Sequence, residues 1–167
     1  MTNTNDASHP RRTELVMAGL RVTLGVLFLT VWASNLDKGL YNADQYAALI
    51  RAYIDEGNAP GLWKDLMGVI ADGASVFSKM QLVTELALGV LLTIGLATRI
   101  AGVVAGLYLT SLWISELGVP NEWTWSLVFP ALAAFAVAWL HESKAFGVDS
   151  MLLQRSPFDR LPGWVRG

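Results

Sequence analysis

The chain of 167 residues contains no cysteine and only two histidines, His9 and His141. Without cysteine, disulfides, thiol nucleophiles and iron–sulfur ligation by thiolates are excluded. The two histidines are too few and too far apart for a bis-histidine haem within one chain. We therefore expect neither a metal site nor a haem.

Charged residues are also scarce, at 16% of the chain, and the formal net charge is only −2. A nucleic-acid partner would require a basic cluster, which the sequence does not have. Hydrophobic residues make up 53% of the chain, which points away from an ordinary soluble domain. The expected surroundings are therefore a lipid bilayer.

Four windows are apolar enough to span that bilayer: residues 15–36, 80–98, 100–117 and 123–140. Each is close to the roughly 20 residues that a hydrocarbon core of ~30 Å requires. The predicted fold is an all-α integral membrane protein, a four-transmembrane-helix bundle over residues 15–141. The second and third windows almost touch, so a tight turn near Thr98 and Arg99 must divide them. The first window is too long for a signal-peptide core and is interpreted as a retained anchor.

Basic residues predict the orientation of this bundle. They lie before the first window, between the second and third, and after the fourth, whereas the short connection between the third and fourth windows has none. The positive-inside rule then places both termini in the cytoplasm, the polar segment 1–14 and the tail 142–167. The basic residues concerned are Arg11, Arg12, Arg99, Lys144, Arg155, Arg160 and Arg166.

The long first connection, residues 37–79, then faces outward and is not a simple linker. Apolar residues recur at helical spacing over residues 42–57, and again over residues 62–72 after a break at Asn58 to Gly61. One or two amphipathic helices are expected, lying on the outer surface or capping the bundle. Whether they act as a lid or only fill space remains open.

Each spanning window carries one stripe of polar or small residues, which we expect to face the interior. Gly102 and Gly106 form a GxxxG pair that favours close helix contact. The stripes of the first two windows are Arg21, Gly25, Phe28, Trp32 and Asn35, and Ser78, Gln81, Glu85 and Gly89. Those of the last two are Tyr108, Ser111 and Ser115, and Ser126, Pro130, Ala134, Val137 and His141.

Glu85 is the strongest functional candidate, because a carboxylate at the centre of a spanning helix costs about 3 kcal/mol or more. Counting ~1.5 Å per residue from the outer ends places Glu85, Phe28 and Tyr108 in one layer. An acid, a phenol, indoles and a hydroxyl around an apolar space would suit a quinone. The quinone-binding candidates are Phe28, Trp32, Tyr108, Ser111, Trp113 and Ser126, with Glu85 as the catalytic candidate.

Each of these assignments has a structural alternative. Glu85 can be a hydrogen-bonded acid that only locks the bundle, and the tryptophans can form an interfacial aromatic belt. Arg21 lies roughly 12 Å deeper than Glu85, so a direct salt bridge is not expected. Its structural alternative is snorkelling to the inner headgroups. Arg21, Asn35, Lys38 and Arg99 are assigned structural or anion-attracting roles.

Several motifs together resemble the DoxX/DoxD-like membrane family. The first motif is the face of the first window that carries Arg21 and Gly25 and ends with Asn35, Lys38 and Gly39. The second is the stretch TELALGVLLTIGLATRIAG, and the third is AWLHESKAFGVDSML after the last window. The most specific is E-x3-G-x5-G-x2-T-R, running from Glu85 to Arg99. The APGLW and NEWTWSL segments make the DoxD branch the closer match, the small subunit of thiosulfate:quinone oxidoreductase. The similarity covers residues 21–152.

This resemblance implies a multi-pass protein of a prokaryotic cell membrane, linked to quinone-dependent oxidation of sulfur compounds. In one hypothesis, thiosulfate electrons pass to a quinone beside Glu85, and Lys38, Lys64 or Lys79 attracts the anion. A weakness of this hypothesis is that the outer connection carries six acidic and only four basic residues, a charge balance that does not attract an anion. In the other, the chain is a non-catalytic anchor or scaffold for a second oxidoreductase subunit, docked through the basic segment 144–166. The sequence predicts no oligomeric state.

Overall fold

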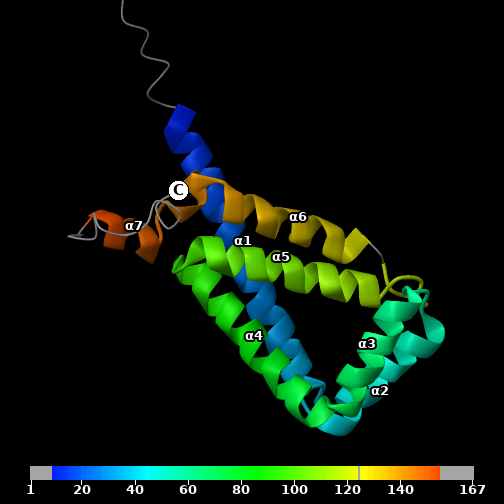
Figure 1. The fold of residues 1–167 in the computed structure, drawn as a ribbon. Coiled ribbons are helices and arrows are strands. Elements are labelled where there is room, and N and C mark those ends of the chain that lie inside the picture. The colour runs from blue at the N-terminus through cyan, green and yellow to red at the C-terminus, as the bar shows by residue number, and fades with distance from the viewer. Residues whose placement is uncertain (1–8, 124, 155–167) are drawn as a thin grey trace, which may run out of the picture.

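The computed structural model describes residues 9–123 and 125–154, and every element within them is helical (Figure 1). The four longest apolar helices are α1 (His9–Asp37), α4 (Ala74–Ile94), α5 (Thr98–Ser115) and α6 (Trp125–Trp139). Two shorter helices, α2 (Ala43–Glu56) and α3 (Gly61–Asp72), lie between α1 and α4. A 3₁₀ turn, η1 (His141–Lys144), and α7 (Val148–Gln154) follow α6.

Three helices are long and apolar enough to cross a membrane: α1 from Arg12, α4 and α5. Helix α6 is apolar but has only 15 residues, which is about 22 Å at the usual rise. The chain is therefore a helical membrane protein, with α6 shorter than the ~20 residues of a typical span.

The helix boundaries differ from the predicted windows, most clearly at α4. That helix covers residues 74–94 instead of 80–98, because it begins directly after Gly73 and ends at Gly95. Gly95 has φ +70°, a conformation that favours glycine and stops the helix. The dividing turn is thus 95–97, and Thr98 and Arg99 begin α5.

The start of α1 also shifts by six residues, whereas the bounds of α5 and α6 shift less. The outer connection shortens to residues 38–73, and α1 begins at His9, inside the predicted polar segment 1–14. Helices α5 (98–115) and α6 (125–139) depart by only one or two residues from the windows 100–117 and 123–140. Predictions that concern residues 1–8 and 155–167, including Arg155, Arg160 and Arg166, lie outside the described residues.

The long helices form two pairs that splay apart. Helix α1 packs along α4, and α5 packs along α6, whereas α4 and α5 make far fewer contacts with each other. The pairs meet at the 95–97 turn, which we call the inner end (Figure 1). Helices α2 and α3 close the opposite, open side of this V together with the α5–α6 loop, and we call it the outer end.

Small residues explain why helices within a pair approach so closely. A Cβ on Gly25 of α1 would lie 2.6 Å from the backbone nitrogen of Thr93 in α4. The predicted GxxxG pair has the same role between α5 and α6: a Cβ on Gly102 would lie 2.9 Å from the Ala134 carbonyl oxygen. Close packing at this motif is therefore confirmed. The apolar core contains Leu24, Phe28, Leu88, Leu92, Ala105, Leu109, Ala134 and Val137.

Candidate functional site

The Glu85 carboxylate lies in the middle of α4 with 0% of the residue exposed. It accepts hydrogen bonds from four side chains. Oε1 accepts from the Tyr108 hydroxyl at 2.6 Å and from Gln81 Nε2 at 2.9 Å. Oε2 accepts from the Tyr41 hydroxyl at 2.5 Å and from Asn35 Nδ2 at 3.1 Å, which also lies 3.3 Å from Oε1. We call these five residues the Glu85 cluster.

Three separate parts of the chain supply the donors besides α4 itself. Asn35 is in the last turn of α1, and Tyr108 is in the middle of α5. Gln81 precedes Glu85 by four residues, so both side chains lie on the same face of α4. Tyr41 comes from the loop after α1, where its carbonyl oxygen accepts a hydrogen bond from Lys79 Nζ at 2.9 Å. The cluster therefore joins the α1–α4 pair to α5.

All four donors are neutral, so hydrogen bonds rather than a cation stabilise the buried acid. An ionised carboxylate only accepts hydrogen bonds and has about four lone-pair sites, which these donors fill. Burial raises the pKa of the Tyr41 phenol, and the Glu85 hydrogen bond and charge raise it further. The pKa of the nearby Tyr46 is raised by burial and then by the charge of Glu85. At neutral pH both phenols therefore keep their protons.

Aromatic residues border the cluster, and a buried polar atom on each of α1 and α4 has no hydrogen-bond partner. The rings of Phe28 and Tyr108 are 5.9 Å apart between centroids and tilted by 46°. The Tyr41 hydroxyl also lies 3.3 Å from the Trp32 carbonyl oxygen, so Trp32 is next to the cluster. Trp32 Nε1 and Ser78 Oγ, which is two turns before Glu85 on α4, are buried and have no hydrogen-bond partner.

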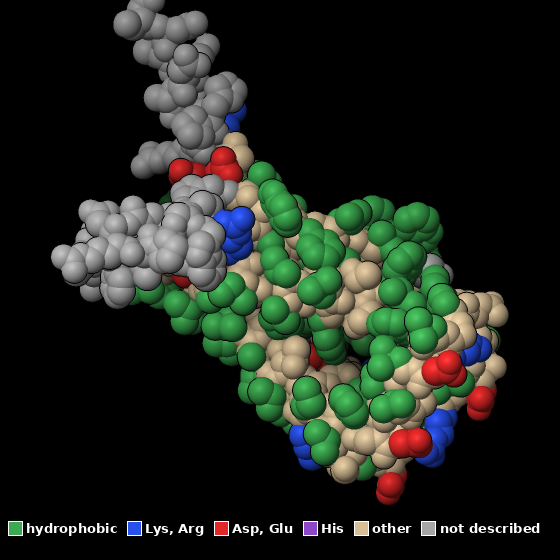
Figure 2. All heavy atoms as spheres, in the orientation of Figure 1, with side chains coloured by type: hydrophobic (Ala, Val, Ile, Leu, Met, Phe, Trp, Pro, Cys, Tyr) green, Lys and Arg blue, Asp and Glu red, His purple; other side chains and the backbone are tan. Residues whose placement is uncertain are grey.

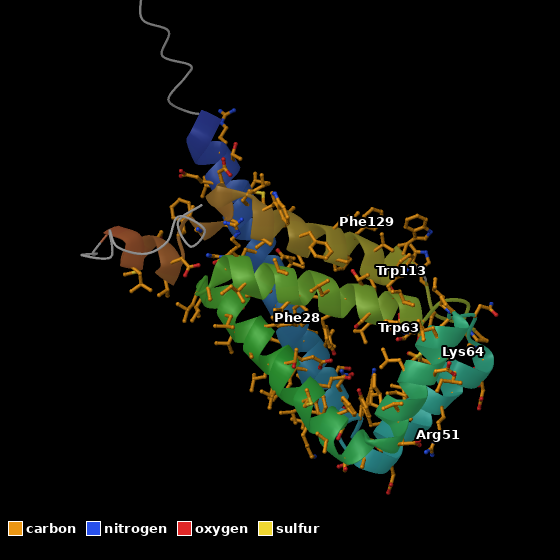
Figure 3. All side chains as sticks on the ribbon, in the orientation of Figure 1. Phe28, Arg51, Trp63, Lys64, Trp113 and Phe129 are labelled. Carbon is orange, nitrogen blue, oxygen red and sulfur yellow. The ribbon has the colours of Figure 1, made fainter. Side chains whose placement is uncertain are left out.

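Figure 2 shows a hollow in the surface between α3 and the splayed helices α4 and α5, with an acidic side chain at its base. In Figure 3, the labelled Phe28 and Trp63 lie to either side of this hollow. The open side of the V is thus not completely filled by side chains.

Of the six predicted quinone contacts, only Tyr108 belongs to the cluster, and Phe28 and Trp32 border it. The Ser111 hydroxyl donates to the Tyr108 carbonyl oxygen at 2.7 Å, within α5. Trp113 instead lines a shallow apolar groove between α5 and α6, and Ser126 is exposed in the first turn of α6. The groove has a volume of about 150 Å³ and is lined by Thr110, Trp113, Val128, Ala131, Leu132 and Phe135.

Arg21 does not snorkel to the headgroups, so that alternative is wrong. Its side chain is 1% exposed and packs against Gly95 and Gly147, where a Cβ would lie 1.8 and 2.2 Å from Nη1. Both glycines are therefore needed to make room for the guanidinium group. Asp149 provides a nearby negative charge, and its carboxylate accepts from the backbone N–H groups of Ala97 and Thr98 at 2.8 Å.

Among the remaining predicted basic residues, Lys79 contacts the cluster, because its Nζ donates to the carbonyl oxygen of Tyr41 at 2.9 Å. Lys38 is exposed after α1, and Arg99 is exposed in the first turn of α5. Lys64 Nζ donates to the carbonyl oxygens of Ile54 and Gly57 at 2.6 and 2.7 Å, and Lys79 holds the Tyr41 loop. Lys64 and Lys79 thus stabilise backbone segments, which weakens their proposed role in attracting an anion.

Sequence reasoning missed Tyr41, because the residue lies in a loop and belongs to no periodic stripe. Gln81 was in the predicted stripe without an assigned role, although its four-residue spacing from Glu85 is a readable signal. Asn35 donates directly to the acid, a contact that its predicted structural or anion-attracting role did not specify.

These features define a helical membrane protein with a buried carboxylate held by two phenols and two amides. Among the described residues, no three His, Asp or Glu side chains gather closely enough to hold a metal ion. The chain belongs to the DoxD family, described as the TQO small subunit DoxD, whose family model matches residues 16–160. No curated protein and no solved structure matches the chain.

Proposed function

We propose that this chain is the membrane subunit of a thiosulfate:quinone oxidoreductase and that the quinone ring binds beside the Glu85 cluster. The observation that carries the proposal is a fully buried carboxylate hydrogen-bonded to two phenols, one from α5 and one from the loop after α1. The family description supports the role as a subunit of this enzyme. The chemistry of the cluster supports the choice of ligand.

The residues present fit a quinone. Its two carbonyl oxygens are hydrogen-bond acceptors, and the indole N–H of Trp32 and the hydroxyl of Ser78 are buried donors without partners. The tilted rings of Phe28 and Tyr108 provide an apolar wall for a flat ring. A bound quinone would accept two electrons and two protons.

The protein's own contribution is to supply and replace those protons. Tyr108 would give its hydroxyl proton to a quinone oxygen, and Glu85, whose Oε1 lies 2.6 Å away, would return a proton to the phenolate after taking one up from water. Tyr41 makes the equivalent hydrogen bond to the other carboxylate oxygen. Asn35 and Gln81 keep the acid in position between the two phenols.

A second candidate function is a non-catalytic membrane subunit. It is favoured by the hydrogen bonds that the protein itself makes to the Glu85 carboxylate. The Glu85 carboxylate needs no ligand to be satisfied, since four protein donors already fill its acceptor sites. In this case Glu85 locks α1, α4 and α5 together, and a larger partner subunit carries the chemistry. The name "small subunit" supports the existence of such a partner.

The proposal also specifies the membrane arrangement. Helix α6 is the fourth span, crossing as a pair with α5. Both termini are on the cytoplasmic side of a prokaryotic cell membrane, and α2 and α3 are amphipathic helices on the outer side. The exposed Trp123 and Trp125 at the start of α6 support this placement, because tryptophans concentrate at membrane interfaces.

Thiosulfate-dependent quinone reduction by the complete complex in vesicles tests the two functions. We expect Tyr108→Phe to lower kcat by about 100-fold, because it removes a proton donor and keeps the ring. Tyr53→Phe is the matched control, since its hydroxyl binds Glu122 at the exposed outer end. Quinone retained by the purified complex is measured by mass spectrometry. If Tyr108→Phe and Glu85→Gln keep full activity and full quinone content, the quinone site is wrong and the non-catalytic role stands.

A further inference from the structure

Helix α3 carries a face of apolar side chains that no other part of the described chain covers. Leu62, Leu66 and Val69 are 85%, 46% and 62% exposed. Spacings of four and three residues place them on one face of the helix. The opposite side of α3 is buried through Met67 and Ala71. The exposed apolar face is therefore not the one that holds α3 to the rest of the molecule.

Both ends of α3 are fixed at the outer ends of membrane-spanning helices. A single residue, Gly73, separates α3 from α4, which is a candidate span from its first residue. Near its other end, Trp63 Nε1 donates to Ser115 Oγ at 2.9 Å, and Ser115 is the last residue of α5. The 12 residues of α3 extend about 18 Å. Helix α3 therefore bridges the outer ends of α4 and α5 (Figure 1).

The exposed face of α3 continues the lipid-facing surface of α4. The first turns of α4 expose Val76, Met80 and Val83, and these residues belong to a candidate span. Gly73 is the only residue between the two helices, and Figure 2 shows hydrophobic side chains over both of them on one face of the molecule. The exposed Trp123 and Trp125 at the same end of the molecule provide an independent marker of the membrane interface.

Charged residues lie on the other side of the α2–α3 unit. Asp65 and Asp72 form an exposed edge of α3, and Arg51 of α2 pairs with Asp72 at 3.1 Å. Helix α2 also exposes Asp44 and Asp55. Figure 2 shows acidic and basic side chains gathered on the outer side of this unit, with hydrophobic side chains toward the hollow. One side of the unit thus suits water and the other suits hydrocarbon.

We infer that α3 lies within the outer leaflet of the membrane, with Leu62, Leu66 and Val69 against lipid acyl chains and α2 facing water. An interfacial helix with an apolar face and a charged edge binds a membrane in this way. The hollow between α3, α4 and α5 then opens into lipid instead of into the aqueous phase. This placement does not depend on quinone binding and holds for either candidate function.

The absence of cysteine allows a direct test with single-cysteine variants of the full chain. Leu66→Cys is labelled with an environment-sensitive fluorophore and reconstituted into phosphatidylcholine vesicles. Quenching is measured with lipids that carry a shallow doxyl group and with iodide on both sides of the membrane. Val83→Cys is the lipid-facing reference and Asp55→Cys the aqueous one, since both residues are exposed.

We expect the label at position 66 to be quenched by doxyl lipid about as strongly as the label at 83, and by iodide at least about twofold less than the label at 55. Leu62→Cys repeats the measurement in case one variant folds poorly. Iodide quenching at 62 and 66 equal to that at 55 would overturn the inference, because the face would then be in water. Protection from both quenchers would also overturn it, because a protein partner would cover the face.

Discussion

Replacing Glu85 by leucine removes the shared acceptor of the Glu85 cluster and keeps a side chain of similar volume. Four donors lose their partner, with the hydroxyls of Tyr41 and Tyr108 among them. Hydrogen bonds between helices in membranes contribute about 0.6 kcal/mol each on average and up to about 1.7 kcal/mol, so four of them amount to roughly 2–7 kcal/mol. Part of this loss is offset, because the leucine variant no longer buries a carboxylate. We expect a net destabilisation of about 2–4 kcal/mol, which lowers Tm by roughly 5–15 °C in a chain of this size.

Thermal unfolding in detergent micelles measures this change. Gln81→Leu is the matched control, because it removes one donor and leaves the carboxylate with three others. Its loss should be about a quarter to a third of the Glu85→Leu loss. An unchanged or raised Tm for Glu85→Leu would refute the reasoning. It would mean that Glu85 is held at a cost to stability, as expected of a group retained for function alone.

Three further predictions concern the outer end, the inner end and the α5–α6 contact. The pKa of Glu116 is raised to about 7, chiefly by burial and then by the charge of Glu122. The unfolded chain therefore releases the Glu116 proton at a lower pH than the folded chain does. As a result, the free energy of unfolding falls as pH rises from about 4.5 to 7. Glu116→Gln should raise Tm relative to the parent at pH 8 and not at pH 4.5. Asp149→Ala removes two backbone caps of α5 and should cost about 1–2 kcal/mol in thermal unfolding, with a smaller loss for Asp149→Asn. Gly106→Ala should cost about 1–3 kcal/mol in the same assay, because its Cβ would lie 2.6 Å from the Phe135 ring, whereas Gly68→Ala, with open space, should not destabilise.

The part of the site that lies on long helices could be predicted from the sequence. Helical periodicity and a rise of ~1.5 Å per residue placed Phe28, Glu85 and Tyr108 in one layer, and the structure brings the three together. The same counting separated Arg21 from Glu85, and the two side chains are not paired. This reasoning works because a helix fixes both the direction and the depth of every side chain along it.

Counting along helices fails where helices diverge or where the chain leaves them. Ser126 was predicted to contact a quinone, but it is exposed in the first turn of α6. Depth alone does not show that α4 and α5 splay apart, because the splay depends on which helix faces carry small residues. The α4 boundaries were also wrong, because the apolar window follows hydropathy, whereas the helix ends are set by Gly73 and Gly95.

The position of Tyr41 shows how the loop after α1 connects the outer end to the buried acid. Lys79 of α4 holds the Tyr41 carbonyl oxygen, and the Tyr41 hydroxyl reaches Glu85 six residues further along the same helix. Together, these two contacts fasten the loop along nearly two turns of α4. Because both contacts are made to α4, the Tyr41 hydroxyl stays positioned against Glu85 by the same helix that carries the acid, whether the cluster binds a quinone or locks the helices.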